Sequence, residues 1–168
     1  MAKAGLVYLR PVPVVFFRIQ GPYATTVSAA WDKMFSWLDT HELRKTAGRG
    51  YGLARDNPRI VGHDKCRYDA CVEVPADLDP MALEKILTQR LPGGAYARQR
   101  HVGQFESIRE VVVQMRDNWA PTAGLSIDSR RPIVTIYLAD PASVDPSQLK
   151  ADVCIPVSVS ADSGRSAA

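Results

Sequence analysis

The sequence predicts an α+β fold made of two copies of a strand–helix–strand–strand unit, each about 80 residues long. Residues 67–74 and 150–157 both show a basic residue, a variable one, Asp, an apolar residue, Cys and then a largely apolar run, 83 positions apart. Gly21, followed by Pro and Tyr, matches Gly103, followed by Gln and Phe, at a spacing of 82. Trp37 and Trp119 keep that spacing near the ends of two helical patterns. Self-similarity at one period is typical of a duplicated unit.

The first copy, about residues 12–75, begins with a β-rich run at 14–20 that ends at a Gly-Pro turn. Thr25 or Thr26 can cap the helix that follows. The apolar residues of this helix recur at spacings of three and four and form one stripe: Val27, Ala30, Trp31, Met34 and Leu38. Phe35 and Trp37 lie toward the edges of the stripe, which predicts a partly exposed surface or a pocket wall there.

Two strands complete the first copy. Glycines at 48, 50 and 52 thin the strand around Tyr51, which indicates the close approach of a backbone or a ligand. In the strand at 68–74, side chains alternate between two faces. One face carries Asp69, Cys71 and Glu73, and the other carries Tyr68, Ala70, Val72 and Val74.

The second copy, about residues 94–158, repeats this order. A strand is expected at 95–102, and two more at 132–138 and 151–159. A helix between the first two has the apolar stripe Ile108, Val111, Val112, Met115 and Trp119 and is expected to end before Pro121.

The two copies are joined by a segment that begins with Asp79 and Pro80, a typical helix start. We therefore expect a linker helix at about 80–91 that is not itself duplicated, within a single domain of residues 1–158. Residues 159–168 are small and polar, which predicts a disordered tail. Two such units can pair their antiparallel sheets about a pseudo-two-fold axis. The helices would then lie on one side, with a ligand-sized cleft between the halves.

The composition is that of an ordinary soluble globular protein, with 46% hydrophobic and 23% charged residues and a net charge of +3. The cysteine pattern predicts a cytoplasmic protein. The basic residues are scattered, so direct binding of nucleic acid is not predicted. The chain shows neither a membrane-spanning run nor a signal-peptide pattern. Its three cysteines form no Cys-x-x-Cys pair and its histidines are dispersed, so we expect no metal site, no cofactor and a reducing compartment.

Four motifs together resemble one known family. They are Gly-Pro-Tyr at 21–23, Gly-Tyr-Gly-Leu-x-x-Asp-Asn-Pro at 50–58, Arg-Tyr-Asp-Ala-Cys-Val at 67–72, and Pro-Gly-Gly-x-Tyr-Ala-x-x-x-His-x-Gly at 92–103. In this order, over residues 12–158, they resemble the GyrI-like small-molecule-binding domain. That domain is also the effector-binding domain of AraC-type and multidrug-responsive transcription regulators, and it is related to DNA gyrase inhibitors.

The resemblance implies a duplicated α+β fold whose cleft takes apolar aromatic compounds, often cationic. It also implies sensing, sequestration or toxin resistance as the role, with DNA gyrase or a transcription regulator as protein partner. We expect a standalone member, because the chain has no room for a further DNA-reading module of about 100 residues.

One position departs from the family pattern. The strand before the second Asp-Pro often carries Glu two positions before its Tyr, and here that position is Thr135, before Tyr137. A carboxylate would pair with a cationic ligand or activate a water molecule, whereas Thr can only form hydrogen bonds. Glu73, in the paired strand of the other half, is the nearest acidic substitute.

Six residues are candidates for ligand binding: Tyr51, Tyr68, Glu73, Trp119, Thr135 and Tyr137. For Trp119 the alternative is a place in the core, since it lies on a helix stripe. For Glu73 the alternative is an exposed position at the end of a strand, before Pro75. Asp69 and Asp152, at repeated positions, are expected to be structural partners of a turn or a cap, and His101 to be a surface or hydrogen-bonded residue.

These residues and the functions that the family resemblance implies leave three possibilities open. The first is a non-catalytic binding module that holds an aromatic compound by stacking and desolvation. The second is a hydrolase of reactive cyclopropane-type genotoxins, in which Glu73 would position water. The third is a protein that inhibits gyrase through its exposed surface.

Overall fold

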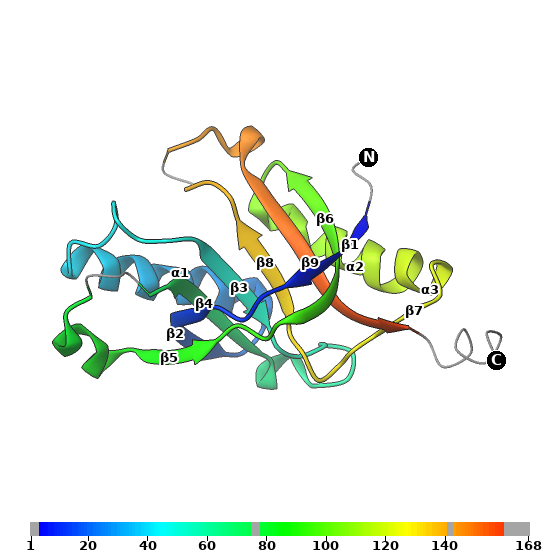
Figure 1. Ribbon diagram of the computed structural model, residues 1–168, viewed down its shortest axis with the longest axis horizontal. Coiled ribbons are helices and arrows are strands. Elements are labelled where there is room, and N and C mark those ends of the chain that lie inside the picture. The colour runs from blue at the N-terminus through cyan, green and yellow to red at the C-terminus, as the bar shows by residue number, and fades with distance from the viewer. Residues whose placement is uncertain (1–3, 75–77, 141–142, 160–168) are drawn as a thin grey trace. The chain divides into compact units, whose positions relative to one another are not determined.

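The computed structural model describes residues 4–74, 78–140 and 143–159, and the chain separates into two compact units (Figure 1). The N-terminal unit is Arg10–Pro92. The C-terminal unit combines the first nine residues with the chain from Gly93 onward.

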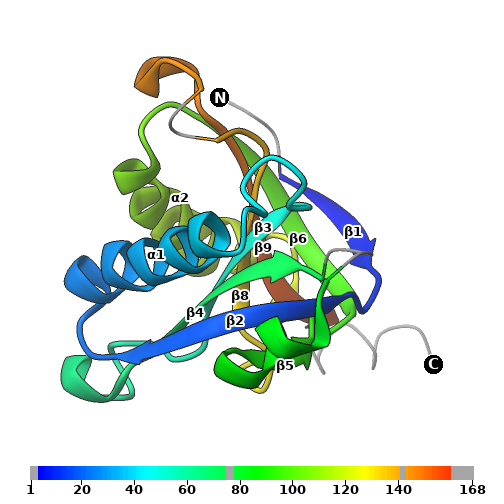
Figure 2. The ribbon, with the colours of Figure 1, turned by 90° about the vertical axis from the view of Figure 1, so that its left-hand side faces the viewer.

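The N-terminal unit is a four-stranded antiparallel sheet in the order β3–β4–β2–β5. The strands are β2 (Pro13–Gln20), β3 (Gly50–Ala54), β4 (Arg67–Glu73) and β5 (Leu87–Arg90). Helix α1 (Tyr23–Thr40) packs on β2 and β4 (Figure 2), and the short 3₁₀ helices η1 (His63–Lys65) and η2 (Pro80–Lys85) lie in the connections.

The alternation predicted for β4 decides which side chains α1 covers. Tyr68, Ala70 and Val72 pack with Val15 of β2 against the helix. From the helix, Ala30, Met34 and Leu38 complete this core, as their spacing predicts. The odd-numbered residues of β4, among them Asp69 and Glu73, therefore lie on the face turned away from α1.

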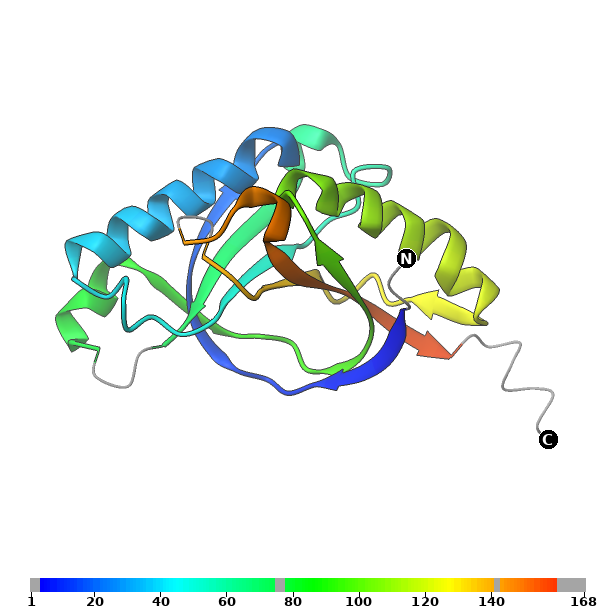
Figure 3. The same cartoon turned by 90° about the horizontal axis from the view of Figure 1, so that it is seen from above.

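The C-terminal unit has a sheet in the order β8–β9–β6–β1, with β7 paired to the end of β9. Its strands are β1 (Gly5–Leu9), β6 (Gly94–Val102), β7 (Leu125–Ile127), β8 (Ile133–Tyr137) and β9 (Lys150–Val159), with the 3₁₀ turn η5 (Pro146–Gln148) before β9. The helical segment contains η3 (Phe105–Ser107), α2 (Ile108–Gln114), the π-helical turn η4 (Met115–Trp119) and α3 (Ala120–Thr122). It runs as one green-to-yellow coil in Figure 3.

The two units share one order of four paired strands, and β7 has no counterpart among the described residues of the N-terminal unit. Gly21 and Gly103 both have positive φ angles, 145° and 129°. Each donates its backbone N–H over 2.8 Å to a carbonyl, that of Cys66 just before β4 and that of Leu149 just before β9. The predicted α+β class with antiparallel sheets is confirmed, and the cleft between the halves stays a prediction.

The linker helix expected at 80–91 is wrong in its second part. Only Pro80–Lys85 is helical, as a 3₁₀ turn capped by the Asp79 side chain, and Leu87–Arg90 is strand β5. This strand also has a counterpart in the C-terminal unit, because β5 pairs with β2 as β1 pairs with β6, 82 residues apart. The leucine spacing suggested a helix, but backbone pairing with β2 prevails there.

Two smaller boundaries also differ from expectation. The second helical segment continues through Pro121 to Thr122, because proline is tolerated in the first turn of a new α-helical stretch. Val159 is the last residue of β9, and the tail expected at 159–168 otherwise lies outside the described residues. In the described part of the chain, no helix is long and apolar enough to cross a membrane.

Candidate functional site

The predicted site residues of the N-terminal unit lie on both faces of its sheet. Tyr68 is on the face that α1 covers. Tyr51 lies directly opposite Cys71 in the β3–β4 pairing, so it shares the other face with Cys71 and Glu73. The structure therefore brings Tyr51 and Glu73 together and separates both from Tyr68.

Tyr51 and Glu73 form a hydrogen-bonded pair. The Tyr51 hydroxyl donates to Oε1 of Glu73 over 2.6 Å, and the Tyr51 ring is buried while Glu73 is half-buried. Burial raises the pKa of Tyr51, and the hydrogen bond and negative charge of Glu73 raise it further. At Gly48, an added Cβ would lie 2.8 Å from the Cβ of Glu73, so this glycine makes room for the carboxylate side chain.

On the helix side, four aromatic residues form a connected group: Tyr23, Trp31, Phe35 and Tyr68. The Trp31 indole N–H donates to the Tyr68 hydroxyl over 2.8 Å. Trp31 also contacts the Phe35 ring at 5.5 Å between centroids, and Tyr23 meets Tyr68 edge-on at 6.4 Å. We call these four residues the aromatic group.

Gly50 explains why Trp31 can sit where it does. An added Cβ at this glycine would lie 3.1 Å from the far edge of the indole ring. The ring thus rests on the glycine-thinned strand, is fixed at its nitrogen by Tyr68, and stays only half-buried. The glycines predicted that some group approaches this strand closely. At Gly50 that group is the Trp31 side chain.

The C-terminal unit has a smaller counterpart on its own helix side. Thr135 pairs with Val153 and Tyr137 with Ala151, and both partners belong to the core under the helical segment. Thr135 is buried, and the half-buried Tyr137 ring meets Phe105 edge-on at 4.8 Å. Trp119 is half-buried and packs against the core of this unit, on the helix rather than the sheet.

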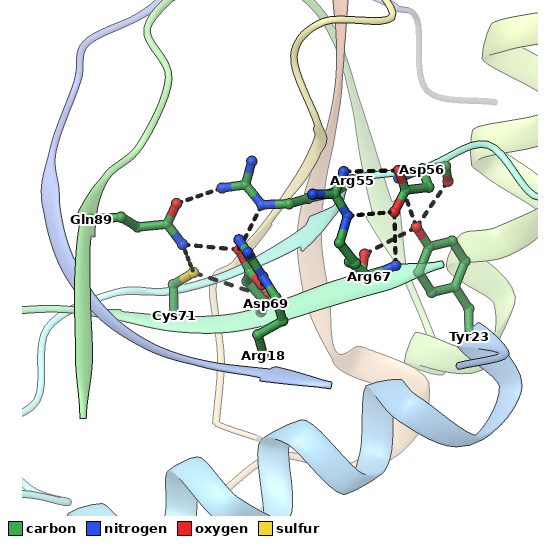
Figure 4. Close-up of polar contacts among 8 residues, drawn as sticks. All are labelled: Arg18, Tyr23, Arg55, Asp56, Arg67, Asp69, Cys71 and Gln89. Carbon is green, nitrogen blue, oxygen red and sulfur yellow. Dashed lines mark hydrogen bonds and ion pairs between the residues drawn. The ribbon is translucent and has the colours of Figure 1, made fainter. Parts of the chain in front are cut away.

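On the face of the N-terminal sheet turned away from α1, Asp69 is the centre of an ion network (Figure 4). Arg18 binds both carboxylate oxygens, at 2.7 and 2.9 Å, Arg55 donates from Nε at 2.7 Å, and Gln89 donates at 3.0 Å. Burial by itself raises the pKa of Asp69, but these hydrogen bonds outweigh it and hold the pKa below its ordinary value. Asp69 is thus a cross-strand partner rather than a turn or cap residue.

Asp152 repeats this role in the C-terminal unit, where Arg100 is its cross-strand neighbour and ion-pair partner. His101 is half-buried and its Nε2 is hydrogen-bonded to the Gln104 carbonyl at 2.8 Å, as a hydrogen-bonded histidine should be. All three cysteines are buried and unpaired, and burial raises the pKa of Cys154 to about 12, which makes it a poor nucleophile. Within the described residues, no cluster of His, Cys, Asp or Glu could hold a metal ion.

Sequence reasoning missed three contacts of these sites: that of Trp31 with Tyr68 and Gly50, and those of Arg55 and Gln89 with Asp69. The glycine at 50, on the helix side of β3, was the available signal for Trp31. For Arg55 and Gln89 the signal was weaker, because their approach to Asp69 depends on strand pairings across 14 and 20 residues.

Comparisons with known proteins agree with this architecture. A "DNA gyrase inhibitor" of Edwardsiella ictaluri is 32% identical over 143 residues, which cover 82% of this chain and 88% of that protein. A "DNA gyrase inhibitor" of Cronobacter sakazakii is 37% identical over 86 residues, so the match spans about half the length of each, 50% and 53%. The solved structure of SAV2435 bound to tetraphenylphosphonium has a TM-score of 0.65 at 11% identity and covers 93% of this chain and 94% of that one.

The family model described as GyrI-like small molecule binding domain matches residues 5–158, nearly all of the described chain. The strand order that the two units share, the glycine turns at equivalent places and this match agree with one another. The chain belongs to the GyrI-like small-molecule-binding domain family.

Proposed function

We propose that this protein binds small, largely apolar aromatic compounds, and that the aromatic group on the helix side of the N-terminal sheet supplies a stacking surface. The observation that carries the proposal is Trp31, a half-buried indole held in place by Tyr68 and supported by Gly50. A fixed aromatic surface binds with little loss of side-chain entropy, because its rotamer is already set before the ligand arrives.

Thr135 and Tyr137 are the residues we propose for ligand contact in the C-terminal unit, from the helix side of its sheet. Thr135 offers a hydroxyl that can accept or donate one hydrogen bond to a ligand, and Tyr137 offers a ring face. Trp119 is half-buried and packs against the core of the same unit, so it can line this surface. SAV2435, which has a similar fold, is bound to tetraphenylphosphonium, an aromatic cation. This supports aromatic compounds as the ligand class proposed here.

Tyr51 and Glu73 need a separate assignment, because they lie on the other face of the N-terminal sheet. A ligand that stacks on Trp31 beside Tyr68 does not reach them through the sheet. The Tyr51 hydroxyl holds the Glu73 carboxylate in a fixed position. Glu73→Gln is therefore the variant that tests any hydrolysis of an electrophile. Three buried, unpaired cysteines support the cytoplasm as the place where the protein acts.

A fluorescence titration tests the proposal. The probes are tetraphenylphosphonium and the neutral triphenylphosphine oxide, with tryptophan emission as the readout. We expect quenching in the native protein and a clear reduction of it in Trp31→Phe, because Trp37 is buried in the core of its unit. Residual quenching in this variant would come from the half-buried Trp119, beside the residues proposed for the C-terminal unit. Tyr68→Phe, which removes the hydroxyl that fixes Trp31, should weaken binding about threefold to tenfold.

Tyr51→Phe is the matched control, since it removes the same hydroxyl group on the opposite face. Equal loss of affinity in Tyr51→Phe and Tyr68→Phe would contradict the assignment of the helix side. Quenching by neither probe, in a protein shown to be folded, would contradict the binding function itself.

A second candidate function is the inhibition of DNA gyrase through protein contact. It is favoured by the names of the relatives, one of which matches over 88% of its length. A supercoiling assay with purified gyrase checks it. Inhibition that persists in Trp31→Phe and Tyr68→Phe would separate this role from ligand binding.

A further inference from the structure

The ion network around Asp69 carries more positive than negative charge. Two guanidinium groups, those of Arg18 and Arg55, share one carboxylate that is fully buried. The remaining member, Gln89, is neutral and bridges the group, because its amide donates to Asp69 and its oxygen accepts from Arg55. The group therefore has a net charge of +1 on the sheet face turned away from α1.

Unused donors remain in this network. Arg18 and Arg55 each use Nε and Nη2, and among the described residues no hydrogen bond engages the Nη1 group of either. The side chains are still accessible, since 37% of Arg18 and 20% of Arg55 is exposed. Figure 4 shows both guanidinium groups gathered at Asp69 on the same side of β4. Partly desolvated guanidinium groups with unused N–H donors favour a bound oxyanion.

The internal repeat supplies a comparison within the same chain. Arg18 and Asp69 correspond to Arg100 and Asp152, which form a simple one-to-one ion pair. Arg55 donates its backbone N–H to the Arg67 carbonyl, as Leu138 does to that of Lys150, so Leu138 stands at the equivalent position.

Gln89 also has an apolar equivalent. It pairs with Val14, as Val7 pairs with Tyr96 in the C-terminal unit. The fold thus needs one arginine on this aspartate, and the second arginine and the glutamine are additions made in one repeat only. An addition that the architecture does not require, and that leaves one charge unbalanced, is expected to serve a ligand.

We propose that Arg18, Arg55 and Gln89 form a binding site for the carboxylate group of a small monoanionic compound. One negative charge would balance the network, and a planar carboxylate matches the fork of guanidinium N–H groups. This site is independent of the aromatic group, because it lies on the opposite face of the N-terminal sheet. It therefore goes beyond the proposed function and does not depend on it.

The test uses the whole protein with benzoate as probe and benzamide as its neutral analogue. Both are titrated by calorimetry in chloride buffer at constant ionic strength. We expect benzoate to bind and benzamide not to bind. In the double variant Arg55→Leu with Gln89→Val, which copies the residues of the other repeat, the benzoate affinity should fall about tenfold to a hundredfold.

This variant keeps the Arg18–Asp69 pair in the form that the C-terminal unit already uses, so it should fold. Arg130→Leu, which removes an arginine whose side chain is 91% exposed, controls for the loss of a positive charge and should leave the affinity unchanged. Equal binding of benzoate and benzamide, no binding of benzoate, or unchanged affinity in the double variant would each overturn the proposal. If tetraphenylphosphonium still quenches Trp31 in the double variant, the two sites are independent.

Discussion

Replacing Asp69 with alanine tests how the N-terminal unit is held together. The carboxylate is fully buried and accepts hydrogen bonds from Arg18, Arg55 and Gln89. Its removal leaves two arginines without their anion, and breaking a buried ion pair from one side costs about 3–5 kcal/mol. The lower end applies here, because Arg18 is partly exposed and water can solvate it. We expect Asp69→Ala to lower the free energy of unfolding by about 3 kcal/mol.

Asp152→Ala is the internal control for this value. Asp152 has the same cross-strand position, but its partner Arg100 is 47% exposed and stays hydrated when the carboxylate is lost. A loss of about 1 kcal/mol is therefore expected. Urea unfolding followed by tryptophan emission measures both variants. Equal costs for the two, or a cost below about 1 kcal/mol for Asp69→Ala, would refute the reasoning.

The difference in stability between the native protein and Asp69→Ala should depend on pH. Because the pKa of Asp69 is lower in the folded protein than in the unfolded chain, its contribution to stability is complete above the unfolded pKa, about 4. It is lost as the pH falls through the folded value. The stability difference between native protein and Asp69→Ala should thus be constant from pH 6 to 8 and shrink below pH ~4. A difference that grows on acidification would contradict the depressed pKa.

Two further substitutions test the ligand surface and the fold. Thr135→Glu should raise the affinity for tetraphenylphosphonium about tenfold while leaving that for triphenylphosphine oxide unchanged, with Thr135→Gln as the uncharged control in the same titration. Gly94→Ala should cost about 2–3 kcal/mol in urea unfolding, because φ is 119° and the new Cβ would lie 2.6 Å from Nη1 of Arg131. Gly5→Ala, with nothing within 4 Å of the new Cβ, should stay within about 0.5 kcal/mol of the native protein.

The duplicated architecture could be predicted because the repeat lies in residues that the backbone itself requires. Gly21 and Gly103 keep their spacing since both turns need a positive φ angle. Asp69 and Asp152 keep their spacing because each binds an arginine on the neighbouring strand, across β2–β4 and across β6–β9. Side-chain alternation then assigned the faces of β4, because a period of two has no other solution once one face is apolar.

The site was harder to predict because it depends on which strands pair. Tyr51 has the same local pattern whichever face it occupies, and only its place opposite Cys71 shows that it joins Glu73 rather than Tyr68. The leucines at 83–91 fitted a helix equally well. Part of this segment forms a strand because it pairs with the edge of β2: Gln89, for example, lies opposite Val14, 75 residues earlier. A local sequence pattern does not contain such a contact.

The comparison of the repeats separates residues that the fold requires from residues that it merely permits. Positions equal in both units, such as the glycine turns and one Arg–Asp pair, are explained by the backbone and the core. Positions that differ at equivalent places are not explained in this way, since Leu138 and Val7 show that apolar side chains satisfy the same backbone. Arg55 and Gln89 therefore owe their polarity to something other than the architecture, and a bound carboxylate is the simplest partner that their combined charge and geometry would accept.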